Sequence, residues 1–402
     1  MRTNETTNLV APRGPVRSQR GMTLVELMVA LLLGLVTTYF IAQVFAVAEG
    51  QKRTATFGTD AQINGAVALH TLRRHVQSAG YGVTPVFESW GCPIKGAFGT
   101  AGSTTAAPAM TLSPIEITPG VSASAPSDSL AVLTSTKTTF AAPMRINKGH
   151  QPGASQADAF SVEASLGVKA SDVILAMPKD WTASAGNCTL FTVQEDTSSP
   201  QTTLSKDTIP HVPSGSASSW NAAASSVWPA GGFGVGDVIV NFGKIRRMVF
   251  GVSTTGDAFQ VVTWTPEGIG NAELLNSNIV LMKALYGRDN DNDGAVDTYD
   301  TTLPVTQADW QKVLTVRVVI VARSGQREPQ VVTAAEPTWN VGSNVAVSYT
   351  KVPGSAATVC AAGGSACQVS LPLAQLSEWQ HYRYKVFDTA IPLRNMIWNL
   401  GS

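Results

Sequence analysis

An apolar run near the start of the chain limits what the rest of it can fold into. Residues 27–48 contain no charged side chain. At about 1.5 Å per residue, a helix of this length spans a hydrocarbon core of about 30 Å. Glu26 stands at the beginning of the run, and three arginines precede it, Arg13, Arg17 and Arg20. The run predicts a single transmembrane helix at about residues 27–48, with one carboxylate at its entrance.

The segment before this run does not resemble a secretory signal peptide. Residues 1–20 have no apolar core of their own, and a secretory signal is cleaved after its apolar region. Here the candidate cleavage site, Gly21, comes before that region, so a cut between Gly21 and Met22 would keep the helix in the mature protein. We therefore interpret residues 1–21 as a leader that its arginines hold in the cytoplasm.

The helix is expected to continue beyond the membrane, because the first proline after it is Pro85. We predict one helix over residues 22–80 whose second half is amphipathic. Its apolar positions recur at spacings near 3.6 residues and are Phe57, Ala61, Leu69, Leu72 and Val76. The opposite side is charged and carries Lys52, Arg53, Asp60, Arg73 and Arg74. This half would pack on the protein's own head domain.

The remaining residues, 81–402, are expected to form a β-rich head domain. Short β-branched and aromatic runs bounded by turn residues predict strands at 130–133, 173–176, 238–240, 261–264, 314–321 and 381–387. Together with the N-terminal helix, this pattern predicts an α+β fold in which a long helix packs on a large β-rich domain.

Composition and motifs argue against several classes of function. The 28 basic and 28 acidic residues cancel, so there is no overall electrostatic case for nucleic-acid binding. A glycine-rich stretch at 232–236 lacks the dinucleotide fingerprint, and no serine occurs in a GxSxG setting. The histidines are not expected to cluster; they are His70, His75, His150, His211 and His381. We therefore expect no enzyme.

Four cysteines follow the apolar run, an even number that suits disulfides in an oxidising compartment. Four cysteines can pair into two disulfides in three ways. We favour Cys360–Cys367, which closes a small Gly/Ala-rich loop, together with Cys92–Cys188. The alternative is that the cysteines are buried free thiols. Metal binding is not expected, because the sequence has no CxxC motif and no Cys/His cluster.

An acidic loop at residues 289–300 has the spacing of an EF-hand calcium loop. The candidate ligands at positions one, three, five, seven, nine and twelve are Asp289, Asp291, Asp293, Ala295, Asp297 and Asp300. Gly294 takes the sharp-turn position. The loop departs from the EF-hand in its last ligand, Asp instead of Glu, and in the strand expected before it. We expect a structural Ca²⁺ site, with a solvated acidic turn as the alternative.

The sequence Gly-Met-Thr-Leu-Val-Glu-Leu at 21–27, between a basic leader and an apolar helix, resembles the class III signal of type IV prepilins. Further similarity lies in three stretches, Arg73–Tyr81, Leu285–Asp289 and Tyr382–Asn395. With these, the chain resembles the PilW family of minor pilins in type IV pilus assembly.

This resemblance implies cleavage by a prepilin peptidase after Gly21 and methylation of Met22. It also implies that Glu26 pairs with the new N-terminal amine of a neighbouring subunit. The implied partners are other minor and major pilins and the inner-membrane assembly platform. The subunit would lie in the bacterial inner membrane with its head in the periplasm, and later at the pilus tip on the cell surface, in a fimbrium used for twitching motility and adhesion.

Two other functions remain open at this stage. One is a large pseudopilin of a type II secretion system, which shares the signal and the architecture. The other is a calcium-dependent tip adhesin.

Overall fold

The structure, a computed structural model, describes residues 21–82 and 90–397 apart from short gaps. The gaps are 101–102, 107–109, 136–142, 151–158, 166, 180, 182–185, 195–206, 212–218, 221–226 and 266–267. Residues 1–20 of the predicted leader and the side chains of Arg53 and Phe57 lie outside the described residues. The chain divides into two units, Met1–Thr56 and Phe57–Ser402.

Helix α1, Leu24–Gln77, runs through the first unit into the second. Its first part, Leu24–Lys52, is long and apolar enough to cross a membrane. Two hydroxyl groups in this part bond to the preceding helical turn: Thr37 Oγ1 donates to the Leu33 carbonyl at 2.7 Å, and Thr38 Oγ1 to the Gly34 carbonyl at 2.8 Å. The helical hydrogen bonds satisfy the backbone N–H and C=O groups, and these local contacts satisfy the two hydroxyl groups. Lipid tails could not provide hydrogen bonds to any of them.

The second part of α1, from residue 58, is amphipathic as the sequence indicated. Its inner face is buried in the head and comprises Ala61, Ala68, Leu72 and Val76. The charged side chains Asp60, Arg73 and Arg74 are exposed. The helix ends at Gln77, three residues before the expected end, and Asn395 Nδ2 then donates to the Ala79 carbonyl at 2.8 Å.

Gly65 lies where α1 approaches the head most closely. A β-carbon on Gly65 would lie 2.1 Å from Cε2 of Phe387, so this ring would have to move. We expect Gly65→Ala to lower the free energy of unfolding by about 1–3 kcal/mol through overpacking. Chemical denaturation measures the change. The matched control is Gly58→Ala on the same helix, because a β-carbon there meets nothing within 4 Å. It should stabilise by roughly 0.5–1 kcal/mol, and equal effects of the two substitutions would contradict this packing.

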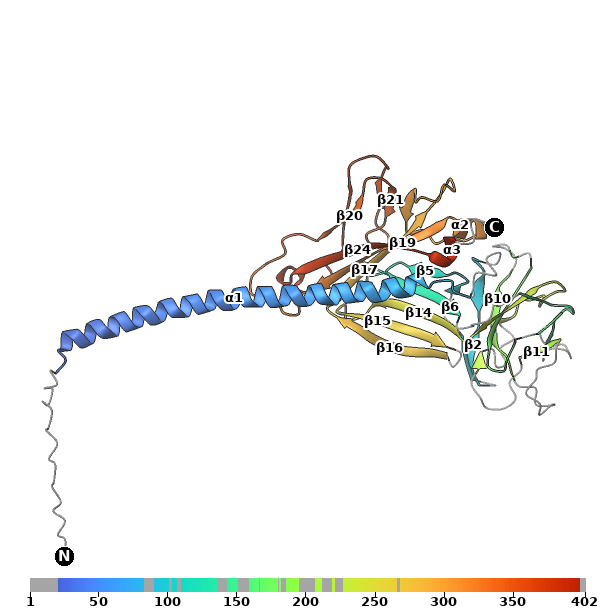
Figure 1. The fold of residues 1–402 in the computed structure, drawn as a ribbon, viewed down its shortest axis with the longest axis horizontal. Coiled ribbons are helices and arrows are strands. Elements are labelled where there is room, and N and C mark those ends of the chain that lie inside the picture. The colour runs from blue at the N-terminus through green and yellow to red at the C-terminus, as the bar shows by residue number, and fades with distance from the viewer. Residues whose placement is uncertain are drawn as a thin grey trace, which may run out of the picture. The chain divides into compact units, whose positions relative to one another are not determined.

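Two sheets form the body of the head (Figure 1). The first is antiparallel with the order β16-β15-β14-β6-β5, and its strands are β5 (Ile115–Thr118), β6 (Ser129–Ser135), β14 (Ile245–Val252), β15 (Ala258–Thr265) and β16 (Gly268–Ser277). The second has the order β22-β21-β18-β17-β19-β24, and its strands are β17 (Ile279–Arg288), β18 (Thr298–Asp300), β19 (Val313–Arg323), β21 (Ala346–Tyr349), β22 (Thr358–Cys360) and β24 (Tyr384–Pro392).

The central strands of the second sheet, β17 and β19, are buried on both faces. Val316, Val318 and Ile320 of β19 join the core that also contains α1 and the first sheet. Val319 and Val321 join a second core, which also contains residues of the two-stranded sheet of β20 (Thr338–Gly342) and β23 (Cys367–Ser370). This burial explains why the run at 314–321 is apolar almost throughout. Short helices complete this region: α2 (Gln307–Gln311), η3 (Trp379–His381) and α3 (Arg394–Ile397).

Strands occur where the sequence predicted them at 130–133, 173–176, 238–240, 261–264 and 314–321. The prediction of a strand at 381–387 is wrong for its first three residues. A 3-10 turn occupies Trp379–His381, and β24 begins only at Tyr384. The alternation of apolar and polar residues there did not reveal the turn, in which Glu378 takes a left-handed φ of 52°.

A lobe from the first half of the head lies beyond the C-terminal end of α1 (Figure 1). Its six-stranded sheet has the order β4-β1-β10-β9-β13-β7, and its strands are β1 (Pro93–Lys95), β4 (Met110–Thr111), β7 (Met144–Arg145), β9 (Val173–Met177), β10 (Cys188–Thr192) and β13 (Val238–Gly243). Smaller sheets join β12 (Ser219–Trp220), β2 (Ala97–Thr100) and β3 (Ser103–Ala106), and pair β8 (Ala159–Ser161) with β11 (Thr208–Pro210).

Both favoured disulfides are present. Cys92–Cys188 joins the residue before β1 to the first residue of β10, and these strands are parallel neighbours in the lobe. Cys360–Cys367 joins the end of β22 to the start of β23. The first disulfide therefore lies within one sheet, and the second joins the edge of the second sheet to the two-stranded sheet of β20 and β23.

The lobe contains a histidine pair that the sequence analysis did not predict. Nε2 of His150 and Nε2 of His211 lie 3.0 Å apart, and both residues are buried. Aromatic rings surround the pair, contributed by Phe160, Phe191 and Trp228. The expectation that the histidines do not cluster is wrong here. His150 bridges to Phe233 and His211 follows β11, so the fold of the lobe brings together two residues that are 61 positions apart.

This pair predicts a loss of stability in acid. Burial, and next the charge of His150, lower the pKa of His211 to about 3. An unfolded histidine titrates near 6.5, so the stabilisation is complete above about pH 6.5 and is lost as the pH falls toward 3. We expect the free energy of unfolding to be about 2 kcal/mol lower near pH 5 than near pH 7 through this group.

Denaturant unfolding of the wild type and of His211→Gln at the two pH values measures this difference. The variant should lose most of the pH dependence, whereas His70→Gln on the exposed face of α1 should keep it. Equal pH dependence in the wild type and in His211→Gln would contradict the prediction.

Candidate functional site

The start of α1 is organised by Thr23, which the sequence analysis noted only as part of a motif. The Glu26 N–H donates to Thr23 Oγ1 at 3.3 Å, and the Leu27 N–H donates to the Thr23 carbonyl at 3.1 Å. Thr23 therefore caps the helix, and Glu26 lies in its first turn. Thr-x-x-Glu is the signature of a capping box, so the sequence contained the signal.

Gly21 and Met22 precede the cap and lie outside the helix. Both are exposed, and nothing lies within 4 Å of the position that a β-carbon on Gly21 would take. A peptidase needs an accessible, non-helical backbone, and these residues have one. A cut between them would place a new amine next to the helix N-terminus, where Glu26 is the acidic group of the first turn.

The acidic loop connects β17 to β18, which pair antiparallel. Three of the predicted ligands lie together, because carboxylate oxygens of Asp289, Asp291 and Asp297 fall within 4.8 Å of one another. Asp289 is buried and fixes the turn: its Oδ1 accepts the Asn292 N–H at 2.6 Å, and its Oδ2 accepts the Gly294 N–H at 2.8 Å. Gly294 has a φ of 86°, which favours glycine.

Two other predicted ligands have different surroundings. Asp293 Oδ1 accepts the Ala295 N–H at 2.7 Å. Asp300 lies at the end of β18, where its carboxylate receives two hydrogen bonds from Arg288, from Nε at 2.7 Å and from an Nη at 3.2 Å. The EF-hand spacing does not anticipate this pairing, because Arg288 lies just outside the loop.

The clustered carboxylates suit a hard cation. A hydrogen bond from the Asp293 N–H lowers the pKa of Asp291, but desolvation and the charges of the neighbouring carboxylates together raise it. Oxygen ligands crowded in this way fit Ca²⁺, which accepts six to eight oxygens in flexible geometry. The residues present therefore fit the ion, with Asp289, Asp291 and Asp297 as the core of the site.

Two family models match the chain. Residues 16–38 match the prokaryotic N-terminal methylation motif, and residues 249–395 match the type IV pilus-assembly protein W (PilW) domain. The second match runs from β14 to α3 and includes the acidic loop, whereas the lobe precedes it. No curated protein and no solved structure matches the chain.

Proposed function

We propose that this chain, in which an N-terminal methylation motif and a PilW domain are matched, is a type IV pilin, a minor subunit that primes pilus assembly and stays at or near the tip. The observation that carries the proposal is the presence on one chain of a methylation motif and a PilW domain. A head of more than three hundred residues suits a terminal subunit better than a repeating one.

The proposed path begins in the membrane. The basic leader stays in the cytoplasm, Leu24–Lys52 spans the inner membrane, and the head folds in the periplasm. Prepilin peptidase cuts after Gly21, and Met22 becomes the methylated N-terminus. Assembly then carries the subunit out of the membrane to the cell surface.

Subunit addition depends on Glu26. A carboxylate among lipid tails is unfavourable, and a neighbouring subunit's amine at Met22 would neutralise it. The attraction between the two charges is stronger in apolar surroundings than in water, so this pairing would set the register between adjacent helices. The partners are other minor and major pilins and the assembly platform. We assign the protein no catalytic role.

Deletion of the gene tests the proposal. We expect loss or strong reduction of surface pili, restored by the wild-type chain, with secretion of folded exoproteins unchanged. Antibody labelling of sheared pili should mark one end of each fibre. A secretion defect with normal pili would instead identify a pseudopilin of a type II secretion system.

We also propose that the acidic loop binds a structural Ca²⁺ through Asp289, Asp291 and Asp297, with Asp293 and the Ala295 carbonyl completing the shell. The ion would neutralise the loop carboxylates and fix the connection from β17 to β18.

Thermal melts test the calcium site. Wild-type protein should melt at a higher temperature in calcium than in EDTA, since an ion that binds only the folded state stabilises it. Asp291→Ala with Asp293→Ala should abolish that difference. The matched control is Asp257→Ala, an acidic residue in the turn before β15. Identical wild-type melts in calcium and EDTA would contradict the site.

A further inference from the structure

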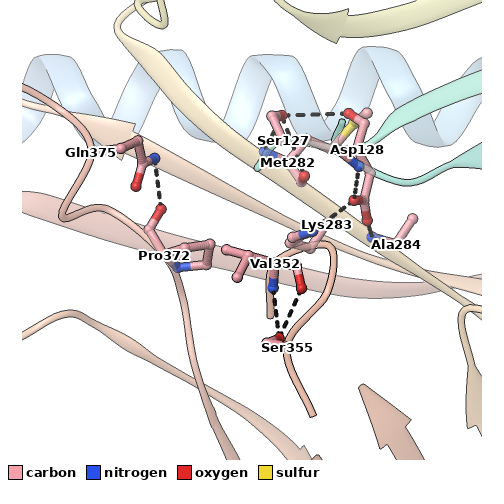
Figure 2. Close-up of polar contacts among 10 residues, drawn as sticks. Ser127, Asp128, Met282, Lys283, Ala284, Val352, Ser355, Pro372 and Gln375 are labelled. Atoms are coloured by element: carbon pink, nitrogen blue, oxygen red, sulfur yellow. Dashed lines mark hydrogen bonds and ion pairs between the residues drawn. The ribbon is translucent and has the colours of Figure 1, made fainter. Parts of the chain in front are cut away.

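One carboxylate and one ammonium group are buried together in the head, on the face of β17 that also carries Leu281 and Leu285. Lys283 lies in the middle of β17, and Asp128 lies immediately before β6. Their side chains are 3% and 2% exposed, and Lys283 Nζ lies 2.7 Å from Asp128 Oδ1 (Figure 2). The residues are 155 positions apart in the chain. Neither the pilin motif nor the acidic loop makes use of this pair.

The backbone holds the two side chains in place. The Asp128 N–H donates to the Met282 carbonyl at 2.8 Å, and the Met282 N–H donates to Ser127 Oγ at 3.1 Å. Two further N–H groups approach the carboxylate: that of Ala284 lies 3.0 Å from Oδ2, and that of Gly120 lies 3.1 Å from Oδ1. An amine and a carboxyl group fixed at contact distance have already lost most of the entropy that a reaction between them would require.

The surroundings of the carboxylate oppose its negative charge. Burial raises the pKa of Asp128, although the charge of Lys283 and the hydrogen bonds to the carboxylate oppose this. In apolar surroundings, transfer of one proton from the ammonium to the carboxylate removes both charges. The products are a neutral amine and a carboxylic acid, which are the two reactants of amide formation.

We propose that Lys283 Nζ and Asp128 Cγ condense to an intramolecular amide. The ammonium transfers a proton to Oδ1, and the free amine attacks Cγ. The Ala284 N–H, already directed at Oδ2, stabilises the negative charge that develops on that oxygen. Nitrogen then loses a second proton to Oδ1, and the C–Oδ1 bond breaks. A carboxylate and an ammonium become one amide and one water, and no oxidant or cofactor is needed.

The bond would change how the head unfolds. It would join the start of β6 in the first sheet to the centre of β17 in the second, and so tie the two sheets covalently. A cross-link that closes a long loop restricts the unfolded chain, and a subunit under tension could not separate the sheets without breaking a covalent bond.

Mass spectrometry of the full chain tests the proposal. The protein is purified in detergent, denatured and reduced so that its disulfides do not contribute. We expect a mass one water lower than the mature sequence with free side chains. Because a succinimide at Asp293–Gly294 would lose the same water, the loss must be located. Trypsin should release a branched peptide that joins the segments containing Asp128 and Lys283, with no cleavage after Lys283.

Two variants provide controls. Lys283→Met removes the amine and should show no loss at this site. Asp128→Asn should form the same amide but lose ammonia instead of water, and the branched peptide distinguishes this loss from succinimide formation at the substituted position. The wild type decides the question even if a variant fails to fold. A reduced wild-type chain at its full calculated mass, or separate Asp128 and Lys283 peptides, would overturn the proposal.

Discussion

Asp128→Ala is expected to lower the free energy of unfolding by about 3–5 kcal/mol, since removal of one partner leaves the other buried and unpaired. Lys283 is 3% exposed, so water cannot replace the lost carboxylate. The result holds whether the two groups form an ion pair or an amide, because either arrangement satisfies Lys283. Denaturant unfolding of the full chain, followed by tryptophan fluorescence, measures the change.

Two controls sharpen this prediction. Arg327→Ala breaks an ion pair with Glu378 whose partners are 42% and 52% exposed, and it should have a much smaller effect. Asp128→Leu combined with Lys283→Met should recover much of the loss, because an apolar pair leaves no buried charge. If Asp128→Ala changed the stability by less than about 1 kcal/mol, the pair would not be the buried link described here.

Glu26→Leu is expected to remove the subunit from pili while leaving it in the membrane. The substitution keeps the apolar span but deletes the charge proposed to attract the amine of a neighbouring Met22. We expect at least a roughly tenfold lower amount of the protein in sheared pili, since a charge pair in apolar surroundings contributes several times its value in water. Quantitative immunoblots of pilus and membrane fractions measure the ratio.

Glu49→Gln is the matched control for this experiment. It removes a carboxylate from the same helix, at the far side of the apolar run, and should leave the protein in pili at the wild-type level. A Glu26→Leu protein that enters pili as efficiently as the control would show that the carboxylate does not direct assembly.

The helix could be predicted well from the sequence because its signals are local. The uncharged run at 27–48 and the periodic positions of Ala61, Leu72 and Val76 determine what faces lipid and what faces the head. The strands at 173–176 and 314–321 were equally clear, since the first is a continuous apolar run and the second is apolar except for Thr315 and Arg317. In each case, the pattern of residues adjacent in the sequence is enough to predict the element.

The acidic loop shows where such local reasoning ends. The EF-hand spacing correctly places Asp289, Asp291 and Asp297 close together. It assigns Asp300 to the same cation, whereas the antiparallel pairing of β17 with β18 sets Asp300 beside Arg288. Spacing predicts which residues a turn brings together, but not which partner a strand places opposite them.

Contacts between distant parts of the chain had no signal in the sequence. His150 and His211, and likewise Asp128 and Lys283, stand far apart in stretches that read as ordinary loops or strands. The bridge of His150 to Phe233, the pairing of β11 with β8, and the packing of β6 beside β17 bring them into contact. Sheet topology of this kind cannot be derived from residue patterns in one sequence.

The N-terminus of the mature protein tests the central claim most directly. That claim is that the apolar helix is retained after cleavage and carries the subunit into the pilus. Mass spectrometry of the protein from sheared pili should find a terminal peptide that begins at Met22 with a methylated amine. A terminal peptide that begins at Met1, or one that begins beyond the apolar run, would contradict the account.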